Sequence, residues 1–462
     1  MYFNQPTEFI TKLLKDISSL SEYEKHIILP DIHYKPQMEA PSSTAIATGD
    51  YIIPSLASAA INDGMSIIKL PFKKNEINDE IIKDFFTQLN IHAAKNKFDM
   101  NKYSLTEEEL LDVCLNGARA VIEKFGLEKT ILNSLELNGV MNEGLKKDDI
   151  NRLVPKMLLK SKFSRAEFGL NFRGNHFLEL QYIDKIEDKT YCFNNVQIEQ
   201  NDLTIMTHLG PGPFTGNLMR LYTNREKIPF SHKYLYFFAK LYFHFLESKR
   251  DELNMNEIIK YFFKPNKYQA YNINSKLGQD FYKLIQIGTN YGYAYQLGTF
   301  TAVRDATRYI QKKYSLSKGD AKLIWNVSHN SIYKEFVDNK EQFVTRHNSV
   351  KIYNNKPTIL AGSYDVPSCI GINYPNANND LMDTHDHGIG SIISRLKKEE
   401  KINFTEEISN RYFFKRGTKI IKKIKSSNIS DYEVIEFITE YFDKENIFRP
   451  WFYVKPIATL KN

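Results

Sequence analysis

The sequence of 462 residues predicts an α+β fold. Short apolar stretches bounded by Pro, Asp, Ser and Gly lie towards both ends of the chain, as is typical of strands. Between them, apolar residues recur at helical spacing at about residues 78–170 and 230–315. Because no internal repeat or low-complexity linker separates these blocks, we expect one interwoven domain over residues 1–462 with two helical insertions.

The elements follow in order along the chain. A helical pattern runs to about Ser19, and "HIILPDIHYKPQMEAPSSTAIATGDYIIPS" indicates short strands joined by loops. "MSIIKLPF", "HFLELQYI" and "DLTIMTH" predict strands, whereas "EEELLDVCLNGARAVIEKF" predicts a helix. After Asn326 short strands return in "SVKIY", "PTILAG" and "SCIGINY". We expect a helix from Gly388 and another from about Tyr432 to Phe442.

Two aromatic stripes fall in the second helical block, "KYLYFFAKLYFHFL" and "YKLIQIGTNYGYAYQL". Rings at helical spacing could form a platform on which bases stack. They are far more often buried, because one apolar face of a helix normally packs on the core. We therefore expect both stripes to be buried.

Composition excludes some classes of protein. Hydrophobic residues make up 42% and charged residues 25%, as in an ordinary globular protein. No apolar run approaches the roughly 18–20 residues of a membrane span, and the N-terminus lacks the pattern of a secretion signal. The cysteines Cys114, Cys192 and Cys369 are far apart and form no CxxC pair. We expect a cytoplasmic protein with no membrane partner, no disulfide and no thiolate zinc site.

The formal net charge of +7 favours a polyanionic partner, although a chain rich in Lys, Asn and Ile can gain such a charge from composition alone. One cluster, "KRGTKIIKKIKSS", is dense in cations. It is either a phosphate-binding surface or a solvated basic face, and both interpretations stay open. The cations are Lys415, Arg416, Lys419, Lys422, Lys423 and Lys425.

Several of the 11 histidines stand beside turn-forming or polar residues, where a ring can point into a cleft. Imidazoles with a carboxylate suit manganese, iron or zinc. No HExxH motif occurs, so any metal site must be assembled from distant segments. The histidines in this setting are His33, His176, His208, His329 and His387.

These segments, taken in order, resemble the RtcB-type RNA ligases. The matching blocks are "LPDIHYKPQMEAP", "AAINDGM", "GNHFLELQ", "THLGPG", "VSHN", "TRHNSVK", "LAGSYDVPS", "HGIGSIISR" and "PIATLKN". They look like the family's PDVH, DxxCGM, GNHFLE, HxGSRG, VAHN, HRKGATR, PGSMGTxS, HGAGRxxSR and terminal VIKG. The resemblance spans nearly the whole chain and implies an RtcB-like domain with central β-sheets around a metal and nucleotide cleft.

The resemblance implies a GTP- and manganese-dependent ligase that joins RNA ends bearing a 3′-phosphate or 2′,3′-cyclic phosphate to a 5′-hydroxyl. His387 matches the histidine that becomes guanylylated, and Asp31 matches the aspartate that orients it. His385 lies outside the motif. The implied partners are RNA, with tRNA as one candidate, and an archease-like activator. We expect a monomer.

Further roles carry over from the family motifs. Glu179 matches the carboxylate that accepts from guanine N1–H and the 2-amino group, a donor pair that adenine lacks. Arg346, Lys351 and His347 stand where a basic loop meets an RNA phosphate. The implied ligands of one or two Mn(II) ions are Asp63, His176, His208 and His329. The implied nucleotide contacts are Asn175, Phe177, Glu179, Asn330, Gly362, Ser363, Ser368, Gly388, Gly390 and Lys461.

The chain departs from the family pattern at its metal and phosphate positions. Asp63 replaces a metal-bridging cysteine, which favours harder cations such as manganese. Ala60 replaces an aspartate and Ser391 replaces an arginine, and "GPGP" replaces GSRG. Two alternatives to a ligase therefore stay open: an enzyme that processes RNA ends by another reaction, and an inactive RNA-binding homologue.

Overall fold

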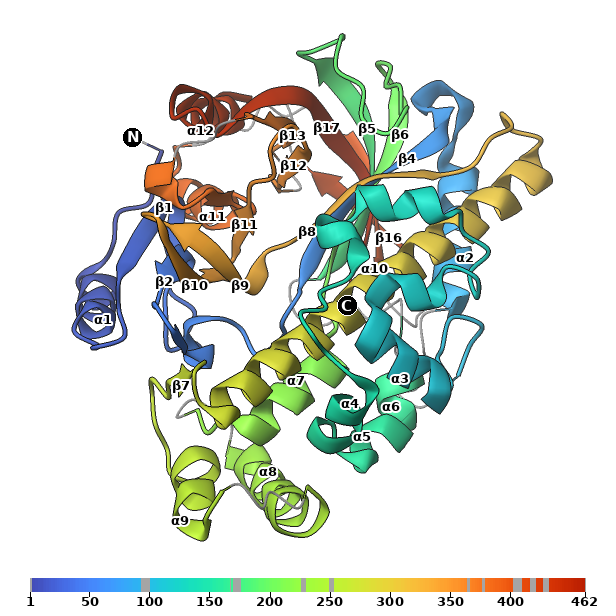
Figure 1. Cartoon of the computed structure of the whole chain (residues 1–462). Coiled ribbons are helices and arrows are strands. Elements are labelled where there is room, and N and C mark those ends of the chain that lie inside the picture. Colours follow the sequence, from blue (N-terminus) through green and yellow to red (C-terminus); the bar gives the residue numbers. More distant parts are fainter. Residues whose placement is uncertain are drawn as a thin grey trace.

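In the computed structural model, helices and strands are interwoven along the chain, as expected of an α+β protein (Figure 1). The structure describes residues 2–92, 100–166, 168, 176–225, 230–248, 253–363, 366–375, 379–401, 409–415, 421–426 and 432–461. Among these residues, no helix combines the length and apolar character needed to cross a membrane.

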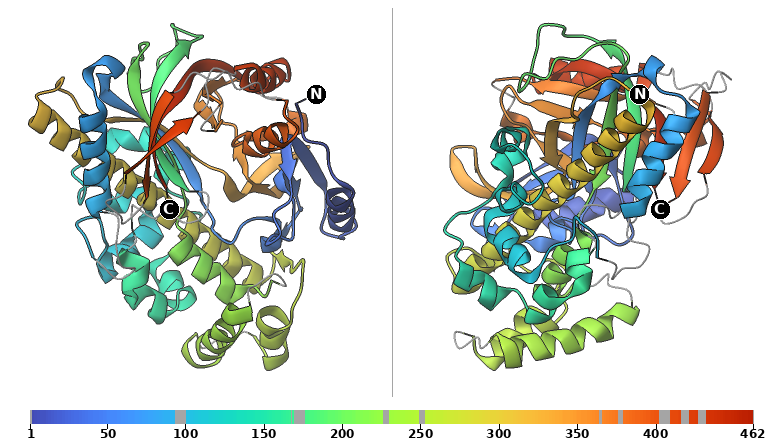
Figure 2. Two further views of the ribbon diagram at one scale, coloured as in Figure 1. Left: turned by 180° about the vertical axis from the view of Figure 1, so that it is seen from behind. Right: turned by 90° about the vertical axis from the view of Figure 1, so that its right-hand side faces the viewer.

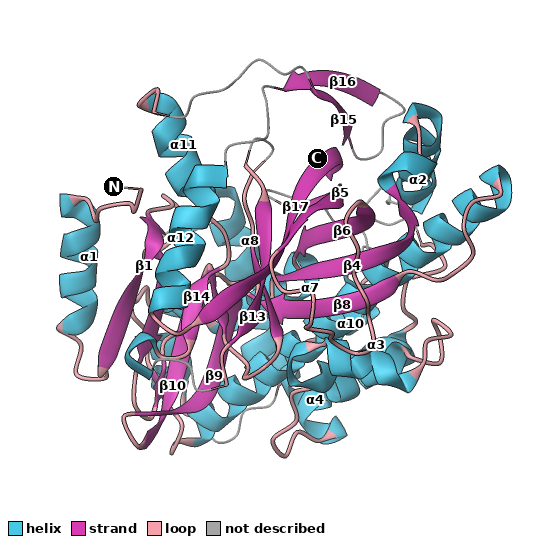
Figure 3. Cartoon of the chain, turned by 90° about the horizontal axis from the view of Figure 1, so that it is seen from above, coloured by secondary structure: helices cyan, strands magenta, loops and turns pink. Residues whose placement is uncertain are grey.

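A nine-stranded sheet forms the centre of the molecule (Figure 3). Its main path follows the order β12-β13-β17-β5-β6-β4-β8, and β15 joins β17 in parallel and also pairs with β16. The strands are β12 (Pro357–Leu360), β13 (Ser368–Asn373), β17 (Phe448–Lys461), β5 (Phe177–Ile186), β6 (Asp202–Leu209), β4 (Gly64–Lys73), β8 (Lys322–Ser328), β15 (Ser409–Lys415) and β16 (Ile421–Ser426).

Smaller sheets flank this one. An antiparallel sheet follows the order β1-β2-β10-β9, with β1 (Lys25–His33), β2 (Ser42–Ala47), β10 (Lys340–His347) and β9 (Asn330–Val337). The pairs are β11 (Ser349–Lys351) with β14 (Thr384–Asp386), and β3 (Tyr51–Ile52) with β7 (Tyr271–Asn272). Most strands alternate little between buried and exposed residues because both faces of the sheets are covered.

Helix α10 (Lys276–Tyr314) is the largest helix and crosses the central sheet (Figure 1). It begins at the N-cap Ser275, whose hydroxyl accepts from Gly278 N, and it ends at Ser315 in the left-handed conformation. The rings of its stripe, such as Tyr291 and Tyr295, are buried against the main core. The prediction of a buried stripe is confirmed here.

The other helices cover the sheets and build a lobe at one end (Figure 2). The α-helices are α1 (Glu8–Ser18), α2 (Asp79–His92), α3 (Glu107–Asn116), α4 (Lys147–Leu153), α5 (Lys156–Lys160), α6 (Lys162–Ala166), α7 (Gly212–Tyr222), α8 (Phe230–Leu241), α9 (Met255–Ile258), α11 (Gly390–Lys398) and α12 (Tyr432–Lys444). The short helices are η1 (Pro54–Leu56), η2 (Lys74–Glu76), η3 (Gly117–Val121), η4 (Lys129–Ser134), η5 (Glu136–Gly139), η6 (Tyr242–Glu247), η7 (Ile259–Phe263) and η8 (Asn379–Leu381).

The first aromatic stripe corrects the sequence prediction. We define the α8–α9 lobe as residues 230–248 and 253–263. Within it Phe243 and Phe262 are buried, but most of the stripe faces outwards. The lobe stands apart from the sheets, so only one side of α8 has the rest of the chain to pack against (Figure 2). Its large exposed side chains are Tyr234, Leu235, Phe237, Phe238, Tyr242, Phe245, Leu246, Met255 and Ile259.

Candidate functional site

Strand register brings the predicted site residues to one end of the central sheet. His208 on β6 lies opposite Phe177 on β5 and opposite Met65 on β4. At the same end, Lys461 on β17 lies opposite Phe177, and Gly64 pairs with Ser328, the residue before His329. Residues far apart in sequence therefore meet where neighbouring strands end.

A cavity of about 200 Å³ opens at this point. We call it the histidine cavity. Its wall consists almost entirely of residues that the sequence predicted: Phe177, Glu179, His208, Gly362, Ser363, Ser368, His387, Gly388, Gly390 and Lys461, together with Ala361. The predicted contact Asn175 lies outside the described residues.

The histidine cluster, defined as His176, His208, His329 and His387, packs ring on ring. Ring centroids are 4.7 Å apart between His208 and His329 and 4.8 Å apart between His329 and His387, and that of His176 lies 5.5 Å from that of His208. Burial holds the pKa values of His208 and His329 well below the usual range and lowers the pKa of His387 to about 3. These three rings are therefore neutral near pH 7, and each keeps a lone pair.

Hydrogen bonds set the tautomers of this cluster. Asn348 N donates to Asn330 Oδ1 over 3.3 Å, which fixes the orientation of the Asn330 amide. Asn330 Nδ2 then donates to His329 Nδ1 over 3.0 Å. It follows that His329 Nε2–H donates to His208 Nε2, 2.8 Å away. The amide of Asn330, predicted to contact nucleotide, thus lies between His329 and Asn348.

The tautomer of His387 is set by a backbone carbonyl. His387 Nδ1 donates to Asn348 O over 2.9 Å, which leaves Nε2 with its lone pair. Asn348 has a φ of 52°, a left-handed conformation that asparagine adopts more readily than most residues. This turn between β10 and β11 aims its carbonyl at the ring.

The role predicted for Asp31 needs correction, because its carboxylate is not the partner of His387 Nδ1. Asp31 Oδ1 accepts from Ile392 N over 2.7 Å and Oδ2 accepts from Ser391 N over 3.4 Å, so Asp31 caps helix α11. Burial, with the nearby Asp386, raises the pKa of Asp31. These two N–H groups at the start of α11 are consequently not free for a phosphate.

Asp63 and His176 have the features of metal ligands that lack a partner. Asp63 Oδ2 lies 3.8 Å from His176 Nε2, while Asp63 Oδ1 and His176 Nδ1 are buried and have no hydrogen-bond partner among the residues that the structure describes. Gly210 leaves room for them: a Cβ there would lie 1.5 Å from Asp63 Oδ1. Oxygen and imidazole donors suit manganese. Within the described ranges, no three His, Cys, Asp or Glu residues already surround one point at metal distance. The residues fit a cation by their chemistry.

The acid end of the histidine cavity is formed by Glu179. Its Oε2 accepts from the Thr459 hydroxyl and its Oε1 accepts from Gln181 Nε2, both over 2.8 Å. Across the cavity the Ser368 hydroxyl accepts from Gly362 N over 3.0 Å and so shapes the loop that carries Ser363. Two hydrogen bonds thus hold the Glu179 carboxylate in place, and it lines the histidine cavity together with Lys461.

Lys35 is a cation that the sequence analysis missed. It is half-buried just after β1, and its charge helps to lower the pKa values of His208, His329 and His387. It is also attracted to Asp63 and Asp31. In the sequence, Lys35 stands two residues after His33 in "PDIHYK", and only this closeness could have indicated it, since the family motif PDVH ends at the histidine.

The prediction that a basic loop contacts RNA is wrong for Arg346. The Arg346 guanidinium is fully buried. It forms a bidentate ion pair with Glu335 and also donates to Met382 O and Thr384 Oγ1. Lys351 also pairs with Glu335, at 3.1 Å, and His347 is buried with Nδ1 on Pro41 O. Of the other basic cluster, Arg416 and Lys419 lie outside the described residues.

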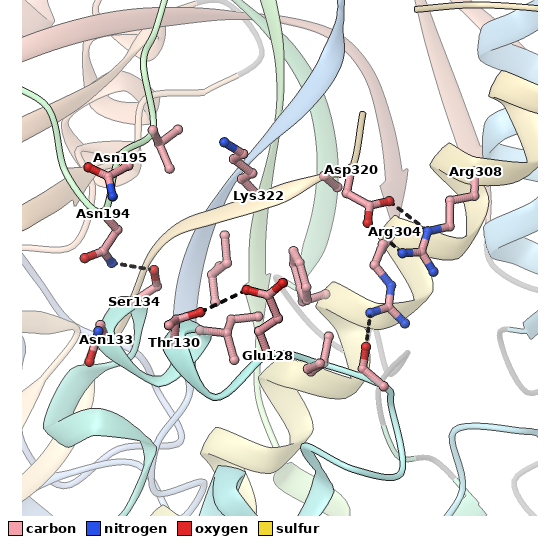
Figure 4. Close-up of a pocket in the computed structure, with 17 residues that line it drawn as sticks. Glu128, Thr130, Asn133, Ser134, Asn194, Asn195, Arg304, Arg308, Asp320 and Lys322 are labelled. Carbon is pink, nitrogen blue, oxygen red and sulfur yellow. Dashed lines mark hydrogen bonds and ion pairs between the residues drawn. The ribbon is translucent and has the colours of Figure 1, made fainter. Parts of the chain in front are cut away.

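A larger cavity, of about 630 Å³, lies elsewhere, between η4, the loop around Asn194, α10 and β8 (Figure 4). It contains no histidine. Its arginines are already engaged: Arg308 pairs with Asp320, and Arg304 donates to the carbonyls of Phe125 and Gly126. We therefore place the functional site at the histidine cavity, where neutral imidazoles, a braced carboxylate and an ammonium converge.

Fold and site together define an α+β protein with a cavity lined by two histidines, a carboxylate and a lysine at one end of its central sheet. A family model described as "tRNA-splicing ligase RtcB" matches residues 13–462, and the chain belongs to this family. It is 22% identical over 421 residues to a tRNA-splicing ligase RtcB of Methanococcus maripaludis, covering 86% of this chain and 79% of that protein. The protein of Nanoarchaeum equitans with the same name is 22% identical over 419 residues (85% and 79%). RNA-splicing ligase RtcB homolog 1 of Entamoeba histolytica is 22% identical over 477 residues (96% and 82%).

Proposed function

We propose that this chain is an RNA ligase that uses GTP and manganese to join an RNA 3′-phosphate or 2′,3′-cyclic phosphate to a 5′-hydroxyl through a guanylylated His387. Family membership supports the RNA ligase class. The observation that carries the finer proposal is the hydrogen bond from His387 Nδ1 to Asn348 O. This bond presents an unprotonated Nε2 beside a cavity that also contains Glu179 and Lys461.

In the first step, His387 Nε2 attacks the α-phosphorus of GTP. A nitrogen–phosphorus bond forms and the bond to the bridging oxygen breaks, so pyrophosphate leaves with that electron pair. The pKa of about 3 keeps the ring neutral before attack, because burial disfavours the imidazolium. The Asn348 carbonyl remains bonded to the Nδ1 proton throughout and stabilises the charge that the ring gains.

GMP then passes from His387 to the RNA 3′-phosphate. The nitrogen–phosphorus bond breaks and a pyrophosphate link to the RNA end forms. The 5′-hydroxyl of the second RNA attacks that end, loses its proton, and releases GMP. A cyclic phosphate must first be opened by water to a 3′-phosphate.

Guanine selection is assigned to Glu179. The contacts from Thr459 and Gln181 hold its carboxylate in place, and a carboxylate accepts well from guanine N1–H and the 2-amino group. Adenine offers no such donor pair. A site built for a hydrogen-bonded group discriminates strongly against a ligand that lacks it.

Manganese would be held by Asp63, His176, His208 and His329. For the last two to act as ligands, the hydrogen bond between His329 Nε2 and His208 Nε2 would first have to break and His329 would have to take its other neutral tautomer. When bound, it would supply charge neutralisation for the triphosphate and the leaving pyrophosphate. Lys35 and Lys461 add fixed positive charge on this chain, which matters because Ser391 and "GPGP" provide no arginine. The Ser391 hydroxyl instead accepts from Asn4 Nδ2 over 3.1 Å.

Labelling tests the proposal. With Mn²⁺ and α-³²P-labelled GTP the protein should become covalently labelled, and H387A should remove the label. Labelling by ATP at an equal rate would contradict the role of Glu179. Labelling without joining of a 3′-phosphate RNA to a 5′-hydroxyl RNA would favour a different end-processing reaction. No labelling with any divalent metal would favour an inactive RNA-binding homologue.

A further inference from the structure

The α8–α9 lobe lies at the periphery of the molecule (Figure 1, Figure 2). Nine large hydrophobic side chains among the described residues of the lobe are exposed. Phe238 is 65% exposed and Leu235 is 64% exposed, although both belong to the stripe that the sequence analysis expected to be buried. Extended exposed patches of this kind usually mark a binding surface.

The exposed rings form a connected series. Ring centroids lie 5.6 Å apart between Phe238 and Phe237, 5.6 Å apart between Phe237 and Phe263, and 6.0 Å apart between Phe263 and Phe245. The first two contacts are edge-to-face, so neighbouring rings point in different directions. Such a series offers several separate ring faces to a ligand.

A cavity of about 290 Å³ lies beside these rings, between the end of α7 and α8. Its wall combines basic side chains and aromatic rings, and none of the described residues that line it is a carboxylate, in contrast to the cavity of Figure 4, which contains Glu128 and Asp320. The lining residues are Asn224, Arg225, Lys233, Tyr236, Phe237, Lys240, Phe262, Phe263 and Pro265.

Lys240 is a buried amine in this wall, and burial lowers its pKa from the usual value of 10.5 to about 7. Its Nζ donates to Thr223 O over 2.6 Å, to Phe262 O over 2.8 Å and to Asn224 Oδ1 over 3.5 Å. Three acceptors suit an ammonium, which has three protons. Among the residues that the structure describes, neither Lys240 nor Lys233 forms an ion pair with a carboxylate. Arg225 has one, with Glu39 at 3.7 Å. Because the protons of Lys240 are taken by these three oxygens, the exposed Lys233 is the cation of this wall that an anion would meet.

We propose that the α8–α9 lobe binds single-stranded RNA, with bases stacked on Phe237 and Phe238 and a backbone phosphate at Lys233. Exposed rings beside a basic groove are the combination that single-stranded nucleic acid requires. Charge complementarity favours RNA over a second copy of this net-positive chain. This inference rests on the proposed function, which makes RNA the substrate.

The position of the lobe agrees with this inference. Helix α7 begins shortly after His208 and ends just before Asn224 and Arg225. Its 11 residues span about 16 Å. A short single strand can therefore reach from the histidine cavity to the lobe.

The inference can be tested by measuring how tightly the full chain binds a fluorescein-labelled ten-nucleotide RNA with a 5′-hydroxyl. Fluorescence anisotropy gives the Kd. GTP and divalent metal are omitted, so the readout is independent of guanylylation. We expect F238A and K233E each to raise the Kd about 5- to 10-fold, since each removes one stacked base or one phosphate contact. The matched controls F336A and K340E alter an exposed phenylalanine on β9 and an exposed lysine on β10, and should leave the Kd within twofold.

Unchanged Kd values for both lobe variants would overturn the inference. So would a change of mass in light scattering with unchanged RNA binding, because the lobe would then be an interface between copies of this chain. Guanylylation is measured in parallel and should be retained in both lobe variants. If the wild-type chain binds RNA through the lobe but takes no label from GTP, the proposed function fails while the RNA-binding inference stands.

Discussion

The histidine cavity and the α8–α9 lobe both concentrate rings, but the chain builds them differently. The cavity wall takes His208 and His387 from distant segments, with His329 packed against both; strand register places His208, the Asn330 amide contacts His329, and a backbone carbonyl orients His387. The lobe takes its rings from two neighbouring helical segments, and most of the large side chains of its α8 stripe are exposed. Long-range β pairing determines the first region, whereas local helix formation determines the second.

This difference shows what a sequence pattern can reveal. Motif residues at strand ends indicate a site because pairing leaves them few alternative positions. An aromatic stripe on a helix indicates only that one face is apolar. Whether that face meets the core depends on where the helix docks.

The contrast within the lobe can be measured directly through stability. Phe262 is fully buried and stacks on His244 with ring centroids 3.8 Å apart, whereas Phe238 is mostly exposed. We expect F262A to lower the free energy of unfolding by about 3–5 kcal/mol through loss of burial and the cavity left behind. F238A should change it by less than about 0.5 kcal/mol. Chemical denaturation measures both, and equal losses would mean that the stripe is packed after all.

Gly210 tests how tightly the histidine cavity is constructed. A Cβ at this position would lie 1.5 Å from Asp63 Oδ1 and 2.9 Å from His176 Cε1, so G210A must displace both side chains. We expect guanylylation to fall about 100-fold, comparable to misplacing a group at a reacting centre. Gly212 provides the control, because nothing lies within 4 Å of a Cβ there. If G210A and G212A label equally, Asp63 and His176 are not needed where they stand.

Variants of Asp31 distinguish its role in capping helix α11 from the predicted role of orienting His387. An asparagine keeps one acceptor oxygen, which can serve the shorter bond from Ile392 N, so D31N should keep labelling within about threefold, whereas D31A keeps neither acceptor and should lose about 1 kcal/mol of stability and several-fold in labelling. Thermal unfolding and GTP labelling measure the two effects. A collapse of labelling in D31N with unchanged stability would favour a direct contact with His387.

The buried histidines predict how stability depends on pH. Burial lowers the pKa of His385 to about 4 from its usual value of 6.5, so between these values the unfolded chain binds a proton that the folded chain does not. Stability should therefore fall as pH drops from about 6.5 towards 4, by on the order of 3 kcal/mol for this residue, of which about 2 kcal/mol is lost by pH 5. Asp386, whose pKa burial raises to about 7, acts in the opposite direction. Denaturation at pH 7 and pH 5 should show a smaller loss in H385F than in the wild type, and an equal loss would contradict this reasoning.

Much of the fold was predictable because the strands carry strong patterns. "HFLELQYI" and "DLTIMTH" are β5 and β6, and the helices predicted near Gly388 and Tyr432 are α11 and α12. The length of β17 was not predicted, since its terminal residues were considered only as a motif. The outward face of α8 was predicted wrongly, because periodicity does not show what a helix packs against.

The sequence predicted which residues line the site, but not the hydrogen bonds and ion pairs between them. The motifs identified the residues that line the histidine cavity, including Glu179 and Lys461. The motifs could not show that a main-chain atom, Asn348 O, sets the tautomer of His387. Nor could they show that Arg346 forms a buried ion pair with Glu335. Backbone groups and buried ion pairs depend on the folded geometry and leave no side-chain pattern of their own.

The atom of His387 that carries GMP is the most direct test of the central claim. Protein labelled with GTP and Mn²⁺ can be digested under alkaline conditions that preserve the phosphoramidate, and the His387 peptide examined by ¹H–³¹P and ¹H–¹⁵N correlation NMR. Because Nδ1 is bonded to Asn348 O, GMP should be attached at Nε2. Attachment at Nδ1, or at a residue other than His387, would contradict the account.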